Sequence, residues 1–198
     1  NGYDDEDFKD IPPLPDDGKE LGVHAGHLAV NQNPTGLWAA LQKLIQSKNL
    51  TQSLQLDFYG SIHADVHQAL EDLGLLENCV FHGYIPHDEL VAVMKRAALL
   101  FFVVPETSYA KGIPTSKLFD YMGAGRPILG IGPEDGDAAA FLSQSQIGRV
   151  IENEPENIHR FLVSLFKGEN RHVTSAQTDS FTRRHLTGQL AELFAQLV

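Results

Sequence analysis

Eight consecutive apolar residues, 97–104, restrict the fold of this chain more than any other part of its sequence. A run of this length that ends at Pro105 is typical of a strand buried on both faces, as in a parallel sheet. A loop with Gly112 follows, and then Thr115 and Ser116, which are residue types that precede or open helices. This order predicts a helix N-terminus at the carboxyl edge of a sheet, where anions are favoured.

The predicted helix ends at Gly123-Ala124-Gly125, and residues 128–131 form the next strand. Placing the residues around a helix at about 100° per residue gives two faces that differ in polarity. The polar face holds Lys117, Asp120, Tyr121 and Ala124, and the apolar face holds Leu118, Phe119 and Met122. A cation near the helix start suits a phosphate or diphosphate, and a carboxylate one turn later suits sugar hydroxyls. An ordinary solvated ion pair is the alternative.

The rest of the chain alternates between short strands and helices. The patterns predict further strands over residues 23–30, 54–59, 80–81 and 147–151, and helices over 33–47, 64–73, 87–96, 135–143, 155–166 and 186–197. Six strands alternating with helices predict an α/β fold with a doubly wound, mostly parallel, Rossmann-like sheet and helices on both of its faces.

Residues 1–20 differ from the rest in composition. Eight acidic and two basic residues give this segment a net charge of −6, out of −11 for the whole chain, and residues 11–15 read Ile-Pro-Pro-Leu-Pro. Such a segment is typical of a linker, and we expect none of it to enter the core. We therefore predict an interdomain linker over residues 1–20 and a Rossmann-like domain over 21–198, with a C-terminal helix over 185–198.

Composition excludes several classes of function. The net charge of −11 argues against a general nucleic-acid binder. The single cysteine, Cys79, excludes an internal disulfide and fits a reducing, cytoplasmic compartment. No stretch approaches the roughly 18 apolar residues of a membrane-spanning helix, so we expect no membrane contact. The nine histidines lack zinc-site spacing, so we expect no metal; His63, His82 and His87 read as surface or capping residues.

Two further loops belong to the same predicted edge. Gly26 follows the first strand pattern, where it either lets a phosphate approach or marks a tight strand–loop junction. Residues 82–86 follow another strand, and Tyr84 either stacks on a nucleobase or packs in a plain turn. The residues alone leave both pairs of alternatives open.

Taken together, these segments resemble the C-terminal, donor-binding domain of GT-B glycosyltransferases of the retaining family-4 type. Asn1-Gly2-Tyr3-Asp4 with Phe8 resembles the segment that joins the two GT-B domains. Ala25-Gly26-His27-Leu28 resembles the first strand and loop, and Phe81-His82-Gly83-Tyr84-Ile85-Pro86 resembles the nucleotide-side loop. Residues 112–128 are similar to the most recognisable segment of the family. The resemblance covers essentially the whole chain in order.

The resemblance implies a phosphate end and a base end of a donor site. Lys117, with the backbone at Thr115 and Ser116, would lie near the diphosphate, and Gly26 would sit by the phosphates at the first loop.

At the other end, Asp120 stands where the family usually has a glutamate that binds the ribose hydroxyls. Tyr84 and Ile85 would flank the base. The resemblance assigns no catalytic residue to this chain.

The sequence departs from the family pattern in two places. The paired acids of the family stand eight positions apart, and the residue eight positions before Asp120 is Gly112. Gln32 occupies a place where a basic phosphate ligand is common, so that the basic ligand is instead Lys111, Arg126 or neither of them. These departures keep two other functions open: a non-catalytic module with a degenerate donor site, or half of a nucleotide-sugar epimerase.

The resemblance implies a hexosyltransferase that moves a sugar from a UDP- or GDP-type nucleotide-diphospho-sugar to an acceptor hydroxyl, in the cytoplasm and in polysaccharide biosynthesis. The donor is a substrate, and no cofactor is expected. The partner is the N-terminal acceptor domain of the same protein, without which we expect this chain to be inactive. The final helix, with Leu186, Leu190, Leu193 and Leu197, either reaches that domain or packs on its own sheet.

Overall fold

The eight-residue apolar run forms the centre of a parallel sheet. A computed structural model describes residues 1–47, 50, 52–168 and 178–196. Its strands are β1 (Lys19–Ala25), β2 (Ser53–Tyr59), β3 (Cys79–Gly83), β4 (Leu99–Val103), β5 (Ile128–Ile131) and β6 (Gly148–Ile151). They lie in the order β3-β2-β1-β4-β5-β6, and each neighbouring pair is parallel. The predicted doubly wound sheet is thereby confirmed.

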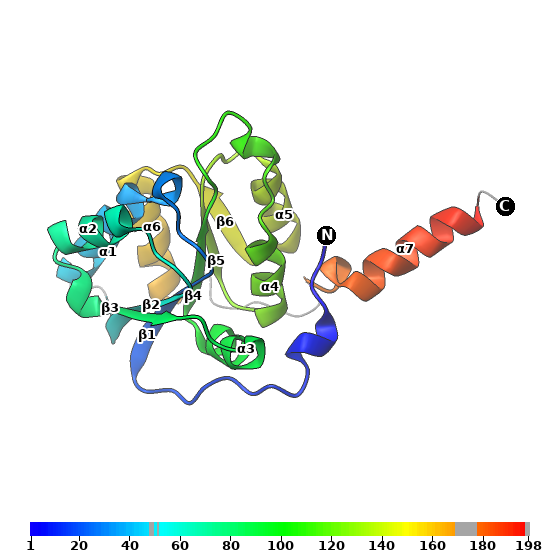
Figure 1. Cartoon of the computed structure of the whole chain (residues 1–198), viewed down its shortest axis with the longest axis horizontal. Coiled ribbons are helices and arrows are strands. Elements are labelled where there is room, and N and C mark those ends of the chain that lie inside the picture. Colours follow the sequence, from blue (N-terminus) through cyan, green and yellow to red (C-terminus); the bar gives the residue numbers. More distant parts are fainter. Residues whose placement is uncertain (48–49, 51, 169–177, 197–198) are drawn as a thin grey trace.

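Helices cover both faces of this sheet (Figure 1). They are α1 (Thr35–Gln46), α2 (Ala64–Asp72), α3 (His87–Arg96), α4 (Ser116–Ala124), α5 (Asp137–Ser145), α6 (Pro155–Phe166) and α7 (Arg183–Ala195). Short 3-10 helices include η1 (Asp5–Phe8), η2 (Val30–Gln32) and η4 (Ala110–Gly112). Helices α1, α2 and α6 pack on one face, and α3, α4 and α5 pack on the other.

Strand β4 is covered by helices on both faces, which explains why its sequence is apolar at every position. All five of its residues are buried. Leu100 and Phe102 join the hydrophobic cluster beneath α3, α4 and α5, whereas Leu99, Phe101 and Val103 join the cluster beneath α1, α2 and α6. Side chains alternate between the faces of a strand, so a strand covered by helices on both sides must be apolar throughout.

Three predicted elements are displaced along the chain, one of which is the final helix, expected over residues 186–197 and found as α7, Arg183–Ala195. The first strand was expected over residues 23–30, but β1 runs from Lys19 to Ala25 and stops at Gly26, whose φ of +118° ends the extended backbone. The helix expected over 135–143 begins later, at Asp137, and ends at Ser145. Strand β1 also begins two residues inside the segment that we expected to be linker.

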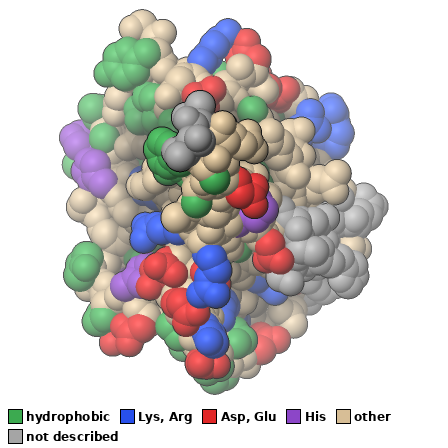
Figure 2. All heavy atoms as spheres, turned by 90° about the vertical axis from the view of Figure 1, so that its right-hand side faces the viewer, with side chains coloured by type: hydrophobic (Ala, Val, Ile, Leu, Met, Phe, Trp, Pro, Cys, Tyr) green, Lys and Arg blue, Asp and Glu red, His purple; other side chains and the backbone are tan. Residues whose placement is uncertain are grey.

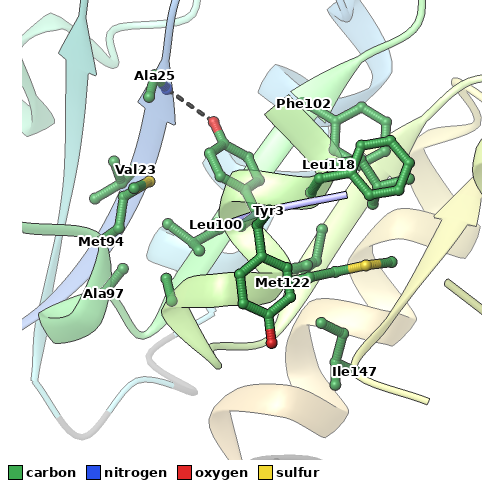
Figure 3. Close-up of a cluster of buried hydrophobic side chains, with 14 of the residues drawn as sticks. Tyr3, Val23, Ala25, Met94, Ala97, Leu100, Phe102, Leu118, Met122 and Ile147 are labelled. Carbon is green, nitrogen blue, oxygen red and sulfur yellow. Dashed lines mark hydrogen bonds between the residues drawn. The ribbon is translucent and has the colours of Figure 1, made fainter. Parts of the chain in front are cut away.

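The acidic N-terminal segment contributes to the core, so the expectation that residues 1–20 stay outside it is wrong. Tyr3 and Phe8 are buried and pack edge to face at 5.7 Å. The backbone of Tyr3 bonds to that of Phe181 and Arg183, which holds the two ends of the described chain together. Figure 3 shows Tyr3 lying among the side chains of the core, close to Met122. The favourable free energy of burying two aromatic rings brings this segment onto the core although most of its other residues are acidic or polar.

Helix α7 projects away from the sheet (Figure 1), so it does not pack on its own sheet. None of its described residues is buried, and Leu190, Leu193 and Phe194 are each more than half exposed. Leu197 lies outside the described residues. Acidic and basic side chains are intermixed on the face around α7 (Figure 2), and Arg184 pairs with Glu6 at 3.0 Å. In the described part of the chain, no helix combines the length and hydropathy that crossing a bilayer requires.

Tyr121 is also placed differently from the prediction. We expected it on the polar face of its helix, but its ring is fully buried between α4 and the sheet. Its hydroxyl accepts a hydrogen bond from the Ala25 backbone N–H at 2.8 Å, drawn as a dashed line in Figure 3, and donates one to the Phe101 carbonyl at 3.2 Å. Burial raises the pKa of Tyr121, so the hydroxyl stays protonated.

Replacing Tyr121 with phenylalanine should therefore leave the Ala25 N–H without its partner. We expect Tyr121→Phe to lower the free energy of unfolding by about 1–3 kcal/mol, measured by urea denaturation. Tyr109→Phe is the matched control, because Tyr109 is largely exposed. Equal stabilities for the two variants would contradict the structural role of the buried hydroxyl.

Candidate functional site

The carboxyl ends of β1 and β4 diverge, which opens the sheet where its strand order reverses. Their pairing is limited to Gly22 with Leu99 and Val23 with Leu100. In doubly wound sheets, ligands bind outside the carboxyl ends of the strands at such a point. The Tyr121 hydroxyl bridges the divergence.

His24 lies in the same gap and was missed by sequence reasoning, since a histidine within an apolar strand carries no motif. Its ring is fully buried and its Nδ1 lies 3.1 Å from the Phe101 carbonyl. Because a carbonyl only accepts, the hydrogen-bond network places the ring hydrogen on Nδ1. Burial, followed by the positive charge of Lys117, lowers the pKa of His24 to about 3, so this ring is neutral near neutral pH.

Three glycines lie side by side at the carboxyl ends of neighbouring strands. Gly26, Gly60 and Gly83 follow or end β1, β2 and β3, with φ values of +118°, +114° and +69°. The Gly26 N–H donates to the Tyr59 carbonyl and the Gly60 N–H donates to the Gly83 carbonyl, each at 2.6 Å. A Cβ on Gly60 would lie 2.5 Å from the Gly26 carbonyl oxygen. The floor of the site is therefore backbone without side chains at these three positions, and the close approach of the Gly26 backbone requires a glycine at position 60.

Lys117 lies directly across this floor. Its Nζ donates to the backbone carbonyl of His27 at 3.2 Å, and a Cβ on Gly26 would lie only 2.3 Å from its Cε. Burial lowers the pKa of Lys117. The structure thus brings together Gly26 and Lys117, two predicted site residues that are far apart in the sequence.

The start of α4 adds backbone donors beside Lys117. Thr115 is the residue before the helix, with φ of +40° and ψ of 133°, and its side chain makes no capping hydrogen bond. The capping role expected of its side chain is therefore absent. Positive φ at a β-branched residue is a strained backbone of the kind found at binding sites. Ser116 is exposed at the first position of the helix, where free N–H groups and the helix dipole favour an anion.

Tyr84 and Ile85 follow Gly83 at the end of β3. Tyr84 is 91% exposed, so it is not a tyrosine packed in a turn, whereas Ile85 is partly buried against the core. This exposed ring offers an apolar face to a flat ligand.

Asp120 lies one turn beyond Lys117 on α4 and is half-buried. Burial raises the pKa of its carboxyl group; the charges of His87 and Arg183 act in the opposite direction, and Asp7 adds to the rise. The charged residues that act on this carboxylate are therefore His87 of α3, Arg183 of α7 and Asp7 of η1.

The other basic candidates are engaged elsewhere. Lys111 pairs with Asp135 at 2.6 Å, and Arg126 donates to the Ala97 carbonyl at the opposite, amino end of β4. Gln32 is buried, and its side chain donates to the Val103 carbonyl and accepts from the Ala29 N–H. Open space surrounds the position that a Cβ on Gly112 would take.

A cavity of about 660 Å³ lies along the carboxyl ends of β4, β5 and β6. Its lining includes the carboxylates Glu106, Glu134, Asp135 and Glu152. These charges disfavour a diphosphate there, so electrostatics favour the β1 side of the edge, beside Lys117.

Gly26 and Gly112 make a pair for testing the constrained backbone at Gly26, because Gly112 has neither a positive φ nor a close neighbour. Gly26→Ala adds a methyl group at positive φ against Lys117, and we expect it to lower the free energy of unfolding by about 1–3 kcal/mol. Gly112→Ala adds the same group in open space and should change it by less than about 0.5 kcal/mol. Urea denaturation compares the two. A neutral Gly26→Ala would contradict the positive φ of the Gly26 backbone.

No protein-family model matches the chain, and no curated protein matches it either. Solved structures do match. A glycosyltransferase from Rickettsia africae ESF-5 has a TM-score of 0.72 at 12% identity, over 99% of this chain and 55% of that one. HepE from Anabaena, solved in complex with UDP, has a TM-score of 0.72 at 15% identity, over 99% of this chain and 56% of that one.

A third match is a C-terminal domain by itself. It belongs to LpcC, a group 1 glycosyltransferase family protein from Francisella tularensis, with a TM-score of 0.61 at 13% identity, over 85% of this chain and 89% of that domain. This chain spans about half the length of the first two proteins. At these identities the likeness is one of fold. The chain has the fold of the C-terminal half of a GT-B, group 1 glycosyltransferase.

Proposed function

We propose that this chain is the nucleotide-sugar-binding half of a glycosyltransferase that moves a hexose from a nucleotide-diphospho-sugar to an acceptor hydroxyl. The observation that carries the proposal is the position of Lys117 across Gly26, beside the uncapped start of α4. A partly buried cation and free helix N–H groups at the carboxyl edge suit a diphosphate.

In this proposal the donor lies along the edge of the sheet. Lys117 and the backbone at Thr115 and Ser116 bind the diphosphate, with Gly26 beneath it. Asp120 accepts hydrogen bonds from the ribose hydroxyls.

The base lies against Tyr84 and Ile85. Tyr84 has the exposure that stacking requires, and Ile85 has the contact with the core that holds the loop. We propose a UDP- or GDP-type donor that acts as a substrate, with no further cofactor.

The site can assist the departure of the nucleoside diphosphate. When the bond between the sugar and the diphosphate breaks, negative charge grows on the departing phosphate oxygen. The Lys117 ammonium and the dipole of α4 lie where that charge would be stabilised. We assign no catalytic residue to this chain. We propose that an N-terminal domain of the same protein binds the acceptor and supplies the general base that acts on it. This chain alone is then inactive.

Helix α7 supports the proposal of a partner domain. Its exposed Leu190, Leu193 and Phe194 form an apolar surface that the described residues do not bury. We propose a cytoplasmic protein of polysaccharide biosynthesis, with the N-terminal domain as the partner of α7.

A non-catalytic module with a degenerate donor site is the second candidate. Gly112 supplies no carboxylate for a donor sugar, and the Gln32 side chain is committed to backbone groups. Transfer assays on the protein together with its proposed N-terminal domain separate the candidates, because this chain alone is expected to show no transfer in either case. Incubation with a nucleotide sugar and no acceptor also tests for an epimerase, because only an epimerase would convert the sugar under those conditions.

The proposal predicts a loss of affinity at Lys117. Calorimetric titration of the chain with UDP and with GDP should show saturable binding of one of them, and Lys117→Ala should weaken it by about 1–3 kcal/mol, as expected for a charge-assisted hydrogen bond. Lys111→Ala is the control, since Lys111 already pairs with Asp135. Unchanged affinity in Lys117→Ala would refute this role. A folded wild-type chain that binds neither nucleotide would favour the degenerate module.

A further inference from the structure

Next to the loop of Tyr84 in the sequence, side chains of β2 and β3 form a hydrogen-bonded cluster that contains none of the proposed donor contacts. Asp57 is 5% exposed, and its carboxylate accepts from Gln55 Nε2 at 2.7 Å, His82 Nε2 at 2.9 Å and the Tyr59 hydroxyl at 3.3 Å. A carboxylate only accepts hydrogen bonds, so the network places a hydrogen on Nε2 of His82. Both oxygens of the buried carboxylate therefore have partners.

The ring of His82 is held in two ways. The hydrogen bond to Asp57 fixes the direction in which Nε2 of the imidazole ring points. Stacking on Tyr59, with ring centroids 4.3 Å apart and planes 4° apart, keeps the imidazole plane parallel to the Tyr59 ring. His82 is exposed, as is the rest of β3 from Val80 onward, on this edge strand, and these two contacts hold its side chain there.

His82 immediately precedes the loop that would flank the base. The next residue, Gly83, has φ of +69°, and its carbonyl accepts from the Gly60 N–H, which ties the loop to the floor of the site. On the far side of Tyr84, Ile85 packs on the core. Tyr84 is therefore presented to solvent between two anchored neighbours, and ordering a loop before binding lowers the entropy lost when a ligand binds.

We propose that His82, held by Asp57 and Tyr59, is a positioning residue for the nucleobase: it sets the conformation of residues 83–86 so that Tyr84 is in place before the nucleotide binds. This inference rests on the proposed function of the site. Among the described residues, no group of three histidine, cysteine, aspartate or glutamate residues that could hold a metal ion occurs. His82 acts through the loop and does not contact the phosphates.

Two substitutions separate the two restraints on the ring. His82→Phe keeps an aromatic ring for Tyr59 but loses the donor to Asp57, whereas His82→Gln keeps a donor but loses the ring. His185→Phe is the matched control, because His185 is an exposed histidine on α7, away from the loop. Each variant is titrated calorimetrically with UDP, with GDP and with inorganic pyrophosphate, which has no base, and thermal unfolding checks that it is folded.

We expect His82→Phe to weaken binding of the preferred nucleotide about tenfold, which corresponds to about 1.4 kcal/mol, and to leave pyrophosphate binding unchanged. His82→Gln should weaken the nucleotide in the same direction, and His185→Phe should match the wild type. A merely structural role would weaken both ligands together, which would overturn the inference, as would unchanged nucleotide affinity in both His82 variants. If the wild-type chain binds pyrophosphate but neither nucleotide, the proposed function fails and this inference fails with it.

Discussion

The hydroxyl of Tyr121 joins β1 to β4 where these central strands diverge, and the candidate site depends on this contact. Without a polar group at that point, the Ala25 N–H would be buried without a partner. The same contact fixes α4 against the sheet, because Tyr121 is one of its residues. The position of the helix start, and therefore of Lys117 over Gly26, follows from a buried hydrogen bond one helical turn away.

Two features distinguish the parts of the carboxyl edge: the backbone exposed at glycines and the distribution of charged side chains. Glycines at the ends of three strands leave bare backbone beneath the space that a ligand would occupy, and Lys117 supplies the cation above it. Carboxylates line the edge from β4 to β6, which makes the two halves of the edge electrically different. This asymmetry is why the proposed donor lies on the β1 side, with its base toward Tyr84.

Elements with a local sequence pattern were predictable, and contacts between distant segments were not. The apolar run of β4 and the amphipathic pattern of α4 are local signals, and both elements lie where the sequence indicates. The end of β1 was missed because the apolar pattern continues past Gly26, whereas the backbone turns there. The burial of Tyr3 was missed because acidic neighbours dominate the composition of its segment. Likewise, the pairing of Lys117 with Gly26 and of His82 with Asp57 depends on strand order and register, which no local pattern contains.

We propose that a nucleoside diphosphate binds at the divergence of β1 and β4. Chemical-shift mapping of backbone amides during titration with UDP or GDP is the most direct test of this binding site. The amides of Gly26, Ser116 and Lys117 should shift together with those of residues 83–85, while those of Arg149 on β6 and Arg160 on α6 should stay unchanged. Shifts confined to β6 and α6, or no shifts with either nucleotide, would contradict it.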